Sequence, residues 1–219
     1  MRPMRPDDIL KIRFVSDPRI SPDGRRVAFV LTSLSQERDE YLSNIWMVDT
    51  TGGAPPRRFT TGPGGGTAPR WSPDGTRMAF VSERERGKKG QLMVMPVEGG
   101  EAVALTQLRN GVAAPAWSPD GTRLAFVSRV GGWQEPENEE ERKKSRPARV
   151  ITTLKYRFNG EGFIHDRPPH VFVVPAGGGA RAQLTSGDCP DSDPAWSPDG
   201  HSIAFVSARH DDRDYDDAT

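Results

Sequence analysis

The sequence has one cysteine, Cys189, and no apolar run that approaches the length of a membrane-spanning helix. A single cysteine cannot form an intrachain disulfide, and the N-terminus lacks the apolar core of a secretory signal, so we expect a cytoplasmic protein. No motif places a histidine beside Cys189, which precedes Pro190. We therefore interpret Cys189 as an incidental loop residue and not as a nucleophile.

An excess of charge of either sign is also missing. The 30 Lys and Arg residues balance the 30 Asp and Glu residues, and the formal net charge is zero. A neutral chain has no global electrostatic attraction for nucleic acid or for an anionic membrane surface. We therefore predict neither of these partners.

What the chain does have is an internal repeat. The phrase Ser-Pro-Asp-Gly begins at Ser21, Ser72, Ser118 and Ser197, and a tryptophan precedes the last three copies. Proline presets the backbone for a type I turn and glycine takes the left-handed position that closes it, so each phrase predicts a hairpin. The segment after each turn, such as 78–81, is apolar at successive residues, which is typical of a strand covered on both faces.

Two further strands follow each hairpin. The third strands are predicted at 44–49, 91–96 and 170–175, and the fourth strands end at Thr60, Thr106 and Thr185. Each unit is thus a four-stranded antiparallel meander, and such units repeated in series are the signature of an all-β protein with the β-propeller fold.

The spacing of the repeats sets the domain boundaries. We predict an N-terminal segment at 1–16 with a short helix, propeller blades within 17–208, and an acidic end at 209–219. The individual blades are predicted at 17–60, 68–106 and 113–185, with a partial blade at 193–208 and an insertion at 130–166 in the third. Within the insertion, the charged run 134–146 predicts a solvated, mobile loop, and 150–164 predicts an ordered extension of the blade.

The number of blades is itself informative. Propellers close with about four to eight blades, whereas this sequence holds three complete units and the opening hairpin of a fourth. An unclosed ring leaves a sheet face and strand edges exposed. We therefore expect the chain to be the N-terminal part of a longer protein.

The phrase Trp-Ser-Pro-Asp-Gly-x-x-x-Ala-Phe-Val resembles the repeat of TolB-like proteins and of the N-terminal domain of the prolyl oligopeptidase family. Two stretches, 8–24 and 156–175, resemble the acylaminoacyl-peptidase branch of that family. The resemblance implies a propeller that filters short peptide substrates and a C-terminal α/β-hydrolase domain as its partner, with a Ser-Asp-His triad.

The sequence departs from this pattern because it contains no Gly-x-Ser-x-Gly nucleophile elbow. We assign no catalytic residue and no cofactor to it, and we predict that this chain alone does not hydrolyse peptides. The alternative is a stand-alone TolB-like propeller that acts as a binding scaffold. Homo-oligomerisation and substrate preference stay open.

Within the resemblance, Arg157, Asn159 and Glu161 are the candidates for facing the substrate cavity or the hydrolase domain, although bracing of the insertion is the stronger interpretation. His165, Asp166 and His170 fit no metal-ligand motif because a Pro-Pro kink separates the histidines, so we predict no metal site.

Two other sets of carboxylates stand out in the sequence. Glu139, Glu140 and Glu141 offer a site for a peptide amino terminus, but a solvated loop explains them better. The repeated aspartates are interpreted as turn residues, since their neighbours suit local hydrogen bonding. These aspartates are Asp23, Asp74, Asp120 and Asp199.

Overall fold

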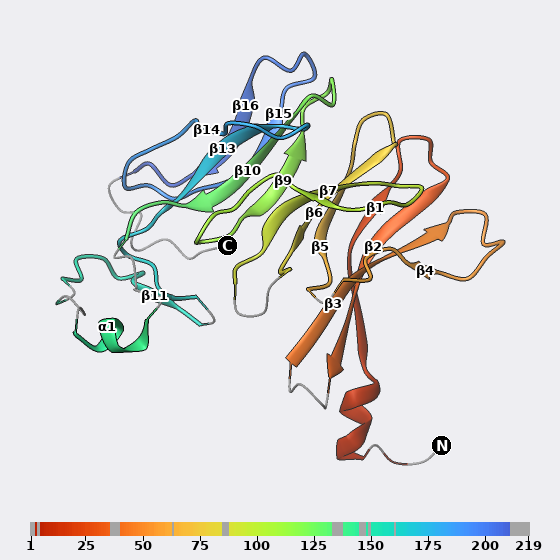
Figure 1. The fold of residues 1–219 in the computed structure, drawn as a ribbon, viewed down its shortest axis with the longest axis horizontal. Helices are drawn as coiled ribbons and strands as arrows, with labels where there is room; N and C mark the ends of the chain where they lie inside the picture. The colour runs from red at the N-terminus through yellow and green to blue at the C-terminus, as the bar shows by residue number, and fades with distance from the viewer. Residues whose placement is uncertain are drawn as a thin grey trace.

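The structure is a computed structural model that describes residue 3 and residues 5–35, 40–62, 64–84, 88–132, 138–144, 148, 150–159 and 161–210. Almost all of the regular secondary structure in the described part of the chain is β-strand. Three four-stranded antiparallel sheets follow one another along the chain, and a two-stranded sheet comes after them (Figure 1). The predicted fold is confirmed: the chain forms three complete propeller blades and the opening hairpin of a fourth, without closing a ring.

The strands pair in chain order within each sheet. The first blade holds β1 (Arg13–Ile20), β2 (Arg26–Ser35), β3 (Glu40–Asp49) and β4 (Arg57–Arg58). The second holds β5 (Thr67–Trp71), β6 (Arg77–Ser82), β7 (Gln91–Pro96) and β8 (Val103–Ala104). The third holds β9 (Ala113–Trp117), β10 (Arg123–Arg129), β13 (Pro169–Pro175) and β14 (Ala182–Gln183), and the hairpin holds β15 (Asp191–Trp196) and β16 (Ile203–Ser207).

The hydrophobic cores lie between blades. Side chains alternate between the two faces of a strand, so Met78 and Phe80 on β6 face the first blade while Ala79 faces the third. Phe126 takes the place of Phe80 in the next repeat and stacks on Phe172 with ring centroids 5.5 Å apart. Each blade therefore presents bulky side chains to the preceding blade and a small alanine to the following one, which explains why these strands are apolar on both faces.

The N-terminus folds against the first blade. A 3₁₀ helix, η1 (Pro6–Lys11), occupies part of the stretch where the sequence predicts a short helix, and the backbone N–H of Arg5 donates to Asp8 Oδ2 at 2.9 Å. The strand β1 then begins at Arg13, which pairs with Ser33 on β2. The first blade thus reaches into the segment assigned by the sequence to residues before 17.

The insertion in the third blade lies beside the blades as a separate lobe (Figure 1). The prediction of a loop for the charged run is wrong over α1 (Glu139–Lys144), where three acidic residues in the first turn and an ion pair of 3.3 Å between Lys143 and Glu139 favour a short helix. Residues 134–137 and 145–146 of that run lie outside the described residues. Neither described helix has the length and apolar character needed to cross a bilayer.

The second half of the insertion does not extend the blade, and that prediction is also wrong. It forms its own small hairpin from β11 (Arg157–Phe158) and β12 (Gly162–Phe163), which pair with each other and with no blade strand. Within the part of the chain that the structure describes, the β-branched residues before it find no partner strand, and Val150 is 77% exposed. High β-propensity therefore did not produce a strand there, because strands need cross-strand neighbours to be stable.

Candidate functional site

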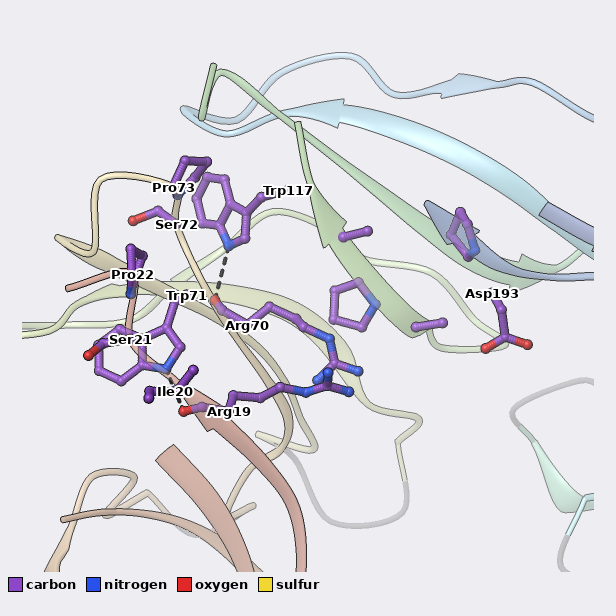
Figure 2. Close-up of a pocket in the computed structure, with 14 residues that line it drawn as sticks. Arg19, Ile20, Ser21, Pro22, Arg70, Trp71, Ser72, Pro73, Trp117 and Asp193 are labelled. Atoms are coloured by element: carbon purple, nitrogen blue, oxygen red, sulfur yellow. Dashed lines mark hydrogen bonds between the residues drawn. The ribbon is translucent and has the colours of Figure 1, made fainter. Parts of the chain in front are cut away.

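The inner strands of the four units line an open cavity of about 650 Å³. In Figure 2 its walls come from β1, β5, β9 and β15, the strands that carry or precede the repeated turns. Its lining includes the side chains of Arg19, Arg70, Trp71, Trp117 and Asp193. This volume lies in the range of pockets that hold small ligands.

An irregularity repeats at the same place in every inner strand. The residue before the strand's proline takes a left-handed backbone in each unit: Asp17 (φ 46°), Ala68 (φ 52°), Ala114 (φ 48°) and Asp193 (φ 50°). The pairing register shifts at each of these points. A bulge of this kind re-aims the side chains around it and costs roughly 1–3 kcal/mol of strain for a non-glycine residue. The fold thus spends stability to shape the cavity wall.

The first two units place Arg19 and Arg70 on this wall, and the carboxylate of Asp17 contacts both. Asp17 Oδ1 lies 2.8 Å from Arg19 Nε, and Asp17 Oδ2 lies 2.9 Å from a terminal nitrogen of Arg70 on the next blade. That nitrogen of Arg70 also donates to the carbonyl of Pro69 at 2.7 Å. One carboxylate therefore holds two guanidinium groups together across a blade boundary.

Tryptophan side chains fix the spacing of the inner strands. The indole Nε1 of Trp71 donates to the carbonyl of Arg19 at 2.9 Å, and that of Trp117 donates to the carbonyl of Arg70 at 3.0 Å. Trp196 makes the same bond, 3.1 Å long, to Ala116. Each tryptophan thus donates to a backbone carbonyl of the preceding unit. The accepting residue is the one after the strand's proline, which is an arginine in the first two units and an alanine in the third.

The repeated turns are closed by their own hydrogen bonds. Ser72 Oγ donates to Asp74 Oδ1 at 2.5 Å, and the backbone N–H of Thr76 donates to the same oxygen at 3.0 Å. The bond from Ser72, followed by those from Thr76, lowers the pKa of Asp74 to about 2. The same bonds from Ser118 and Thr122 lower the pKa of Asp120 to about 2. These aspartates act as turn residues.

The three residues predicted to face a substrate cavity or a partner domain lie on the insertion hairpin and not on the central cavity. Glu161 is 2.7 Å from a guanidinium nitrogen of Arg129 on β10, which ties the hairpin to the third blade. The guanidinium of Arg157 lies 5.6 Å from the ring centroid of Phe163. Asn159 is exposed on the turn between the two strands. The structure brings Arg157 and Glu161 into one small hairpin, and a role toward a partner domain stays a prediction.

His170 is separated from His165 and belongs to a buried polar junction. Its Nδ1 lies 3.1 Å from Asp191 Oδ2, and Arg209 donates to Asp191 Oδ1 at 3.1 Å. Burial raises the pKa of Asp191, but hydrogen bonds from surrounding side chains outweigh burial and lower it. Those side chains are Ser207, Thr185, His170 and Arg209. Within the described ranges, no three His, Cys, Asp or Glu side chains are grouped to hold a metal ion.

Sequence reasoning missed Asp17, Arg19 and Arg70. Comparing the repeats with one another could have found them. The residues on either side of the strand's proline differ from unit to unit, whereas the Ser-Pro-Asp-Gly turn that follows is the same in all four. Alanine fills these positions at Ala114 and Ala116. Because the fold does not fix the side chain at these positions, they can hold residues that serve a function.

Repeated four-stranded blades around a cavity formed by their inner strands define a β-propeller domain. Residues 11–157 match the family model described as TolB beta propeller domain, and the chain belongs to this family.

Two curated relatives are peptidases. The uncharacterized peptidase YuxL of Bacillus subtilis (strain 168) is 40% identical over 201 residues, which cover 91% of this chain and 30% of that protein. Dipeptidyl-peptidase 5 of Porphyromonas endodontalis is 24% identical over 231 residues, covering 99% of this chain and 32% of that protein. The chain thus spans about a third of the length of these relatives.

A solved structure shows the same fold. The acylaminoacyl peptidase of Pyrococcus horikoshii superposes with a TM-score of 0.68 at 21% identity, over 93% of this chain and 29% of that one. The resemblance stated from the sequence is confirmed: the chain corresponds to the propeller portion of proteins of the peptidase family.

Proposed function

We propose that this chain is the gating propeller of a serine-type peptidase, admitting short peptides to a C-terminal α/β-hydrolase domain in the same polypeptide. The observation that carries the proposal is the match to a peptidase of which the chain covers 30%, which leaves most of that protein's length for a catalytic domain. The cavity supports it, since about 650 Å³ is enough space for a short peptide. Cytoplasmic localisation belongs to this proposal.

The first test is the coding sequence after Thr219. A downstream Gly-x-Ser-x-Gly followed by aspartate and histidine is expected. The full polypeptide should then hydrolyse peptide nitroanilides or acyl-amino acid substrates, a serine-directed inhibitor should stop it, and the chain of 219 residues should show no turnover. Turnover by the purified chain alone would contradict the assignment of catalysis to another domain.

Gating has its own measurement. The full polypeptide should cleave a tripeptide substrate and spare an unfolded protein that presents the same terminal residues, because the longer chain cannot enter the cavity. Equal rates on the two substrates would show that the propeller does not filter by size.

A stand-alone scaffold is the second candidate, and the match to the TolB beta propeller domain model favours it. In that case the reading frame stops near Thr219, and the purified chain is soluble and monodisperse. Size-exclusion chromatography with light scattering measures this and gives the oligomeric state at the same time.

A further inference from the structure

The internal repeat shows which residues of the cavity wall the fold itself requires. Ala68 and Ala114 take the left-handed position before proline, and Ala116 takes the position after it, with the same bulge and the same turn in each case. The bulged strand and its turn therefore form with alanine before the proline or after it. The backbone therefore does not require the charged side chains of Asp17, Arg19 and Arg70, so their presence needs another explanation.

The two arginines reach the cavity from one side. Figure 2 shows both side chains extending from neighbouring strands into the space between the walls. Their shared contact with Asp17 brings the two guanidinium groups together, with side-chain exposures of 46% for Arg19 and 25% for Arg70. A guanidinium has five N–H donors, and among the described residues Arg19 uses its Nε and Arg70 one terminal nitrogen for these bonds. The remaining donors are available to a ligand.

The charges around Arg19 and Arg70 restrict the net charge of a ligand that can bind there. Two guanidinium groups against the single carboxylate of Asp17 leave one positive charge on this side of the cavity, and Asp193 stands across it (Figure 2). This field suits a ligand with one anionic group and disfavours a polyanion, which Asp193 would repel. The faces of Trp71 and Trp117 add apolar wall beside the arginines.

From this arrangement we propose that Arg19 and Arg70 form a carboxylate-binding site for short peptides in the central cavity. A carboxylate fits the planar fork of a guanidinium with two parallel hydrogen bonds. Asp17 holds both forks in place before the ligand arrives, which lowers the entropy lost on binding. The carboxylate comes either from the C-terminus of the peptide or from an acidic side chain. Binding needs no hydrolysis, so the site goes beyond the proposed gating role and is testable apart from it.

The experiment is calorimetric titration of the full chain with three peptides. Tri-alanine has a free carboxylate, tri-alanine amide lacks it, and N-acetyl-Ala-Glu-Ala-amide has only a side-chain carboxylate. We expect the free peptide or the glutamate peptide to bind at least about tenfold more tightly than tri-alanine amide, since charge-assisted hydrogen bonds are lost with the carboxylate. The stronger of the two identifies the source of the group. Quenching of tryptophan fluorescence gives a second readout, because two of the five tryptophans, Trp71 and Trp117, lie at the cavity wall.

Four variants assign the effect to the arginines. The double variant Arg19→Ala/Arg70→Ala should weaken carboxylate binding at least about tenfold, and Arg19→Lys/Arg70→Lys should recover only part of it, because lysine keeps the charge but not the fork. The triple variant that adds Asp17→Ala reproduces alanine positions that the third blade already uses, so folding is retained. Arg181→Ala removes one positive charge from an exposed loop and should bind like the unchanged chain. Circular dichroism melting verifies that each variant is folded.

Three results would overturn the proposal. They are equal binding of the amide and both carboxylate peptides, no binding by the unchanged chain up to about 10 mM peptide, and unchanged affinity in a folded variant that lacks both arginines. If the full polypeptide proves not to be a peptidase but binding follows the arginines, the gating role fails and this site stands.

Discussion

Phe126 and Phe205 hold the same place in two copies of one repeat, yet Phe126 is fully buried and Phe205 is 37% exposed. The next residue shows the same contrast, with Val127 at 7% and Val206 at 64% exposure. Both strands have the same Ala-Phe-Val-Ser wording. The difference lies in their neighbours, because β10 pairs with both β9 and β13 whereas, among the described residues, β16 pairs with β15 alone. Burial in a propeller is thus set by the strands packed around a strand and not by its own sequence.

The two phenylalanines give the largest expected difference. Phe126→Ala removes a buried ring stacked on Phe172 and should lower the free energy of unfolding by about 3–5 kcal/mol. Phe205→Ala should cost about 1 kcal/mol, since its ring is already partly in water. Urea denaturation followed by circular dichroism measures both. Equal losses would mean that the hairpin is covered as completely as the third blade.

The hairpin is attached through polar bonds as well, and Asp191 tests their contribution. Asp191→Ala removes the fully buried carboxylate that accepts from His170 and Arg209, and it should cost about 2–3 kcal/mol. Asp188→Ala, in the exposed loop before β15, is the matched control and should change the same denaturation midpoint little. A loss no greater than the control would show that the junction contributes nothing to stability.

Enlarging a small side chain should give a smaller difference in stability between a contact inside the blades and the hairpin. Ala79→Leu overfills the contact between the second and third blades and should cost about 1–3 kcal/mol, since Ala79 is fully buried. Ala204→Leu, the same change on the exposed face of the hairpin, should stay within about 0.5 kcal/mol. Thermal melting compares the two, and the prediction fails if the second variant is destabilised as much as the first.

The smallest effect concerns acid stability of the turns. The pKa of Asp74 and of Asp120 falls from 3.8 to about 2 in the folded chain, so each turn contributes stability above pH 3.8 that is lost as the pH falls toward about 2. Asp74→Asn/Asp120→Asn should flatten the fall of unfolding free energy over this range. Asp199→Asn in the exposed hairpin turn should flatten it less. An unchanged pH profile in the double variant would contradict this account.

Much of the fold could be predicted because the same turn and strand pattern occurs in four copies that can be compared with one another. Proline and glycine at fixed places in four turns specify hairpins, and the strands between them follow from local chemistry. The insertion was harder. Its β-branched residues predict a strand that the structure lacks, since Val150 has no strand beside it, and its charged run predicts a loop where Glu139 begins a helix.

The candidate site was beyond the reach of the sequence for a geometric reason. Asp17 and Arg70 are 53 residues apart and meet only because neighbouring inner strands converge on one axis. The residues singled out beforehand, Arg157, Asn159 and Glu161, lie near one another in sequence and stayed on one hairpin, away from the central cavity. Proximity along the chain could be predicted, whereas convergence of blades could not.

The sequence by itself determined the blade: turn, paired strands, and the alternation of a large and a small apolar residue. These are local properties, because turn chemistry and side-chain alternation act within a few residues. The tertiary structure alone decided which copies are buried and which charges meet, because both depend on the packing of one blade on the next. Asp17, Arg19 and Arg70 became a cluster, and Phe205 became an exposed ring, through that packing.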